Sequence, residues 1–330
     1  MLIVTTTTAC WALDAVTGRA AQFQAGNGVY YGISFDADNI YIAARQAAVG
    51  SDQNIQDNSI LVFDRKLRLI QVLHSPHKIR DVHQIFQHGG RLFVTSTFDD
   101  CILECDLATH RWSRWMPFGE SPLGQDVNHI NSVYISGNTL FLAGLYPLGW
   151  FAEFKLDNRT LIRRVDLGVG THNVWLQNGH VAVCSSLTSE IWEEGGARQS
   201  YIAGAWVRGI ARERGLTYVG ATQDRVSPER ARSDSAIIGT DCSFVFRGYG
   251  MVHDVRSTDC DSTHHGTSID VTVDWMRFWC MDTKEMPQGF SLMEINKIHP
   301  NSVATFISDP DLLPGFPLPF TSCAKEASDQ

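Results

Sequence analysis

A short motif recurs along this chain, and this repeat limits the possible folds more than any other feature. Each copy has a start residue, then a small or polar residue, then an apolar residue, and after a short turn a second β-rich run. The start residues are Tyr31, His83, Asn131, His172, Arg208 and, in a looser copy, Thr267. Two further strand-like stretches lie between successive copies. Each unit therefore has about four strands over roughly 40 to 50 residues, which is typical of a β-propeller blade.

The first residues of the chain match the second to fourth strands of such a unit and lack a first strand. This stretch covers residues 2–23. We expect residues around Leu318 to Cys323 to supply the missing strand, so that N- and C-terminal strands close the ring and remove exposed sheet edges. The result is a single all-β propeller domain over residues 1–330, with seven blades. Six blades is the alternative, in which residues 267–274 pair directly with the N-terminal strands.

The composition is that of a globular protein, and the charge argues against two classes of partner. A net charge of -9 and a pI near 5.7 do not favour binding to nucleic acid or to anionic lipid. No segment is long enough to span a bilayer, and residues 1–8 lack the basic start of a secretory signal. The eight cysteines are scattered, as buried thiols are. These features predict a cytoplasmic protein that binds neither nucleic acid nor membrane.

The histidines are concentrated near the predicted channel. The first strand of each propeller blade lines the central channel, so the start residues are expected to form a ring at one mouth. His129 and the pair His264 and His265 are expected just above this ring, with one of the pair facing the channel. The remaining histidines, His253 among them, fall in predicted turns or outer strands and are expected at the surface.

Imidazole is both a common transition-metal ligand and an acid or base near neutral pH. We therefore predict His83, His129 and His172 as catalytic groups or as ligands of one divalent transition metal, with His265 as a further candidate ligand. The alternative is a water-filled channel whose polar residues bind backbone and water without chemistry.

Arg208 is the charged candidate in the ring. A guanidinium keeps its charge, so it needs an anionic partner, which is either a ligand or a protein carboxylate. The protein candidates are Asp81, Asp126 and Asp270. The predicted substrate-binding residues are Arg208, Asn131, Tyr31 and Thr267.

Several of these elements resemble a known group of sequences. They are residues 81–85 (DVHQI), 128–133 (NHINSV), 171–175 (THNVW), 207–211 (VRGIA) and 2–18. Together they resemble an uncharacterised bacterial family of conserved hypothetical propeller-like proteins over roughly residues 2–257. That family implies no activity. The blades are more remotely similar to gluconolactonase-like and strictosidine synthase-like propellers, but the Glu, Asn and Asp metal ligands of the gluconolactonases have no convincing counterparts here.

The sequence leaves two functions open. The first is an enzyme that acts on a small anionic or polyhydroxylated substrate at the His-rich mouth, with or without a metal. The second is a protein-binding propeller whose polar channel is purely structural. The ring of functional side-chain types favours the enzyme, whereas the lack of a recognisable catalytic triad favours the scaffold.

Overall fold

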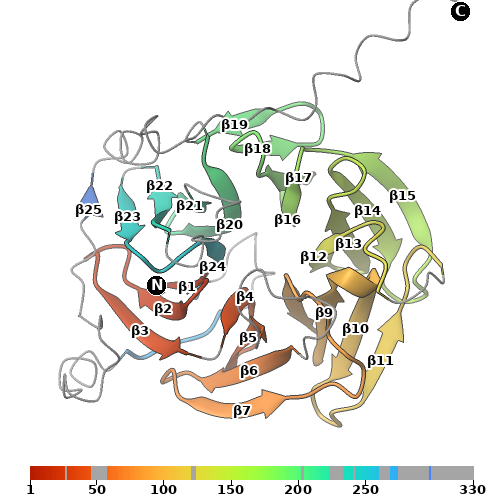
Figure 1. The fold of residues 1–330 in the computed structure, drawn as a ribbon, viewed down its shortest axis with the longest axis horizontal. Helices are drawn as coiled ribbons and strands as arrows, with labels where there is room; N and C mark the ends of the chain where they lie inside the picture. Colours follow the sequence, from red (N-terminus) through yellow and green to blue (C-terminus); the bar gives the residue numbers. More distant parts are fainter. Residues whose placement is uncertain are drawn as a thin grey trace, which may run out of the picture.

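The repeated runs form six antiparallel sheets arranged around a central axis in the computed structural model (Figure 1). The structure describes residues 1–26, 28–45, 58–119, 124–201, 204–222, 233–240, 242–259, 268–273 and 297–298. The first strand of each sheet lies nearest the axis and the last lies at the rim. The all-β propeller prediction is therefore confirmed.

The six sheets are numbered here as blades in chain order. Blade 1 consists of β24 (Val252–Ser257), β1 (Leu2–Thr6), β2 (Ala9–Leu13) and β3 (Ala20–Ala25). Blade 2 consists of β4 (Val29–Phe35), β5 (Asn39–Arg45), β6 (Ser59–Asp64) and β7 (Leu69–Leu73). Blade 3 consists of β8 (Ile85–His88), β9 (Arg91–Ser96), β10 (Cys101–Asp106) and β11 (Trp112–Trp115).

The second half of the ring follows the same order. Blade 4 consists of β12 (Ile130–Ser136), β13 (Thr139–Gly144), β14 (Trp150–Lys155) and β15 (Leu161–Asp166). Blade 5 consists of β16 (Thr171–Gln177), β17 (His180–Ser185), β18 (Glu190–Glu193) and β19 (Arg198–Ser200). Blade 6 consists of β20 (Trp206–Glu213), β21 (Leu216–Thr222), β22 (Ser235–Gly239) and β23 (Ser243–Phe246), with β25 (Lys297–Ile298) paired to its rim.

The favoured count of seven blades is wrong for the described residues, which form six. The strand missing from the N-terminal triplet is β24, which pairs antiparallel with β1 from Leu2 opposite Ser257 to Thr6 opposite Val252. Residues 268–273 form no strand, so the pairing proposed for the six-blade alternative is also wrong. Ile269 instead packs in an apolar cluster with Phe63. Thr267 and the stretch 318–323 lie outside the described residues.

The core lies between neighbouring blades. The inner strands β4 and β12 are buried along almost their whole length, whereas the rim strands β7 and β15 are largely exposed. A strand that is covered on both faces needs an almost continuous apolar run, which explains the motif. Aromatic side chains fill the junction of blades 3 and 4, where the Phe118 and Trp150 ring centroids are 5.3 Å apart in an edge-to-face contact.

The second residue of the repeated motif braces one blade to the next. In blades 4 and 6 the register of the first strand shifts at or next to this point, and an irregularity of this kind leaves a backbone N–H without its ladder partner. In both blades a side chain of the preceding blade accepts a backbone hydrogen there. Asn173 Oδ1 accepts from the Gly209 N–H at 2.7 Å, and Gln84 Oε1 accepts from the Val133 N–H at 3.1 Å.

We expect Asn173→Ala to lower the free energy of unfolding by about 1 to 3 kcal/mol, because it removes the acceptor of a buried N–H. Asn178→Ala is the matched control, since Asn178 has the same left-handed φ (51° against 49°) but is exposed. Both variants lose an asparagine from that conformation, and only the first loses the brace. Equal losses in urea unfolding would show that the brace adds nothing to stability.

The described residues bear on two further expectations. Their only helix is the three-residue 3-10 helix η1 (Thr97–Asp99), so no helix there is long or apolar enough to cross a membrane. The described cysteines are all buried free thiols, namely Cys10, Cys101, Cys105, Cys184 and Cys242. Burial raises the pKa of Cys101 and of Cys184 to about 12, so neither is a reactive thiolate near neutral pH.

Candidate functional site

Polar side chains from all six blades, or from the loops that lead into them, meet at one end of the propeller axis. We call this group the axial cluster; its members are Tyr31, Asp81, His83, His129, His172, Arg208 and His253. The His83 ring centroid lies 5.3 Å from that of His129, 5.9 Å from that of His172 and 5.1 Å from that of Tyr31. The structure therefore brings together the three histidines that the sequence analysis selected, and His83 is at their centre.

Arg208 is held between two imidazoles. Its Nη2 donates to Nε2 of His172, and its Nη1 donates to Nδ1 of His253 at 3.3 Å. His172 Nδ1 lies 2.8 Å from the Gly170 carbonyl oxygen, which only accepts, so Nδ1 carries the ring hydrogen and Nε2 is the acceptor. Burial and the neighbouring Arg208 guanidinium hold the pKa of His172 well below its usual range. His172 is therefore neutral at neutral pH, and it fixes the position of Arg208.

His253 was expected at the surface, and this prediction is wrong. His253 is only 7% exposed and takes the start position of the repeated motif within β24. Its ring centroid lies 4.1 Å from that of Tyr31. Its Nε2 lies 3.2 Å from Thr7 Oγ1. The sequence contained a signal, because Val252-His253-Asp254-Val255 has the same pattern as residues 82–85 and 171–174. The turn-rich region around it hid this sixth copy of the motif.

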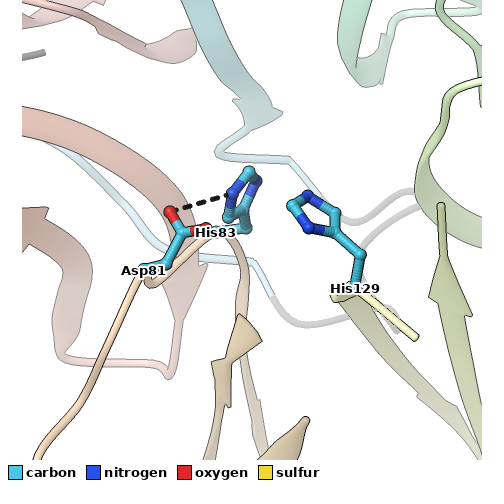
Figure 2. A group of neighbouring side chains, drawn as sticks. All are labelled: Asp81, His83 and His129. Atoms are coloured by element: carbon cyan, nitrogen blue, oxygen red, sulfur yellow. Dashed lines mark ion pairs between the residues drawn. The ribbon is translucent and has the colours of Figure 1, made fainter. Parts of the chain in front are cut away.

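Within the cluster, Asp81, His83 and His129 form one group of neighbouring side chains (Figure 2). The three side chains point toward one another, and one ligand atom from each lies within 4.8 Å of the others. His83 Nε2 is 3.3 Å from Asp81 Oδ1, and the same oxygen pairs with Arg45. The sequence analysis considered Asp81 only as a partner of Arg208 and did not select Arg45.

His129 has a carboxylate behind it. Its Nδ1 is 2.7 Å from Oδ2 of Asp126, and its ring lies edge-on to the His83 ring. A carboxylate behind an imidazole fixes the ring orientation and its tautomer. Asp126 thus has a partner of its own, whereas Asp270, the third carboxylate considered for Arg208, is exposed.

Asn131, the remaining predicted site residue that the structure describes, is not part of the cluster. Asn131 is 1% exposed, and its Nδ2 donates to the Thr171 carbonyl oxygen at 2.8 Å, while its Oδ1 accepts from the Ser132 hydroxyl. These contacts make it a brace between blades 4 and 5. Thr267 and His265 lie outside the described residues.

The fold and the axial cluster together define a six-bladed β-propeller with a histidine-rich axial site. No protein-family model and no curated protein matches the sequence. Among solved structures, a chain of the nidogen/laminin complex is 11% identical with a TM-score of 0.56, and the match covers 77% of this chain and 97% of that one. A streptogramin B lyase structure is 14% identical with a TM-score of 0.45, over 68% of this chain and 81% of that one. At such identities the nidogen/laminin match supports the propeller fold alone.

Proposed function

We propose that this protein is an enzyme that acts on a small anionic or polyhydroxylated substrate at the axial cluster. The observation that carries the proposal is the contact among three imidazoles beside a guanidinium at the axis of the fold, whereas large apolar clusters fill the space between the blades. Groups that can exchange protons or bind a metal near neutral pH are gathered there, whereas a structural core favours apolar contacts.

The chain's residues divide into two roles in this proposal. His83 and His129 act on the reacting atoms, because each has a ring face or nitrogen directed into the cluster. Arg208 attracts the anionic group of the substrate with its permanent charge. His172, which is neutral and hydrogen-bonded on both nitrogens, is a positioning residue that orients Arg208. Tyr31 adds a wall beside His83.

The alternative is a protein-binding propeller with a structural axial cluster. The exposed apolar side chains of the rim strands β7 and β15 favour this function, among them Ile70 and Ile162. In that case small molecules would not bind at the axis, and substitutions in the axial cluster would change stability alone. A binding experiment therefore separates the two functions.

We expect at least one compound from a panel of carboxylates, sugar acids and sugar phosphates to raise the melting temperature and to bind in calorimetry. Arg208→Lys keeps the charge but loses the planar fork, so binding of a carboxylate should weaken by about 1.5 to 3 kcal/mol, roughly ten- to a hundredfold in Kd. Arg65→Lys is the control, because Arg65 is 52% exposed on a turn of blade 2. If Arg208→Lys lowers the melting temperature and leaves binding intact, Arg208 is an internal brace and the anionic substrate is excluded.

A further inference from the structure

We propose that Asp81, His83 and His129 bind one divalent first-row transition metal ion. This inference names the cofactor of the site described under the proposed function and rests on that proposal only for the location. The candidate ligands from the sequence were His83, His129, His172 and His265. Asp81 takes the place of His172 in this proposal, and His265 lies outside the described residues.

The spacing of the donor atoms fits an ion. Two donors at about 2.1 Å from a tetrahedral zinc ion are about 3.4 Å apart, and never farther apart than about 4.2 Å in any geometry. His83 Nε2 and Asp81 Oδ1 are already 3.3 Å apart. The full set spans at most 4.8 Å, so a small rotation of the His129 ring completes the site.

Neighbouring side chains hold two of the proposed ligands in place and exclude His172 as a ligand. Asp126 accepts the Nδ1 hydrogen of His129, so Nε2 is the nitrogen that this ring offers to a cation. Arg45 holds the Asp81 carboxylate from the other side. His172 has both nitrogens engaged, by Gly170 and by Arg208, so it has no lone pair for an ion.

The backbone supports the same pairing of donors. Asp81 and His129 each lie two residues before a start residue, and both have a left-handed φ, 55° and 54°. The equivalent residue of blade 5 is Gly170, with a φ of 66°. Non-glycine residues are uncommon in this conformation, and it persists where the surrounding structure holds it. The local backbone thus presents Asp81 and His129 to His83 from the loops that lead into blades 3 and 4. At the equivalent position in blade 5, Gly170 presents no side chain.

Two imidazoles and one carboxylate suit zinc, iron(II), manganese or cobalt. Three protein ligands leave at least one coordination position for water or substrate, which is the arrangement of catalytic metal sites. Arg208 is hydrogen-bonded to His172, and the His172 ring stacks 5.9 Å from the His83 ring between centroids. Arg208 is therefore the cation that would receive the anionic part of a metal-bound substrate.

The test uses the full chain without a histidine tag, freed of metal with a chelator and then titrated with Zn²⁺ by calorimetry and with Co²⁺ by visible absorption. We expect one equivalent of either ion to bind, with a Co²⁺ spectrum typical of four or five ligands. His83→Ala and His129→Ala should each weaken binding by more than about a hundredfold, and Asp126→Asn by about ten- to a hundredfold.

His180→Ala is the control, since His180 is exposed on blade 5 and should leave the affinity unchanged. Circular dichroism checks that each variant folds. If the His83→Ala and His129→Ala proteins do not fold, Asp126→Asn still tests the metal site. Wild-type protein that binds no ion, or folded His83→Ala or Asp126→Asn protein with wild-type affinity, overturns the metal site. Failure of Arg208→Lys to weaken substrate binding would overturn the anionic substrate and leave the metal site standing, so the two proposals fail separately.

Discussion

Gly209→Ala is expected to be among the most destabilising single substitutions in this chain, with a loss of about 3 to 5 kcal/mol in the free energy of unfolding. Gly209 lies in β20 with a φ of +72° at the junction with β24. A Cβ there would be 2.6 Å from the Val255 nitrogen and 2.8 Å from the Asp254 Cα. Both are backbone atoms, so blades 6 and 1 would have to separate, which adds to the cost of the left-handed conformation.

Gly215→Ala separates these two costs. Gly215 lies in the turn after β20 with a φ of +79°, and a Cβ there meets no atom within 4 Å. Gly215→Ala should therefore lower the free energy of unfolding only by the cost of the left-handed conformation, about 1 to 2 kcal/mol. Gly32→Ala isolates the steric cost. Its Cβ would lie 2.6 Å from the Gln84 Cα, and Gly32 does not have a left-handed φ. Chemical unfolding of the three variants measures the difference, and equal losses for Gly209→Ala and Gly215→Ala would refute the close approach of the blades.

Asp254→Ala is expected to cost about 3 to 5 kcal/mol, since it breaks a buried ion pair. The Asp254 and Arg256 side chains are 1% and 2% exposed, and Arg256 Nε donates to Asp254 Oδ2 at 3.2 Å. Asp254 also accepts the Ile33 N–H at 3.0 Å and so joins blade 1 to blade 2. Arg68→Ala is the control, because its ion pair with Asp64 is at the surface and should contribute less than about 1 kcal/mol. A loss for Asp254→Ala no larger than that of the control would contradict the brace.

The same carboxyl gives a pH dependence with a defined sign. Burial raises the pKa of Asp254, so the folded protein takes up this proton at a higher pH than the unfolded chain. Wild-type stability therefore gains from this group as the pH falls through the raised pKa, and Asp254→Asn lacks the gain. The difference in free energy of unfolding between the two proteins should widen from pH 7 toward the acidic side of that pKa. A constant difference would mean that the pKa is not raised.

The strand pattern of five blades was predictable because it depends on local properties. Alternating or continuous apolar runs and the turns between them are encoded within about 50 residues, and the start residues His83, His172 and Arg208 followed from the same register. The sixth copy at His253 has the same local pattern. It was assigned to the surface because the looser copy at Thr267 was counted in its place.

The sequence by itself determined the all-β propeller and the gathering of His83, His129, His172 and Arg208 at one end of the axis, since both follow from the spacing of repeated strands. Tertiary structure alone decided the six blades, because the strand that pairs with β1 lies about 250 residues away in the chain and any apolar run could have filled that place. It also decided which polar groups meet. Arg45 with Asp81 and His253 with Arg208 are contacts between blades, and Asp126 with His129 is a contact within one loop. All three depend on side-chain directions that a repeat does not specify.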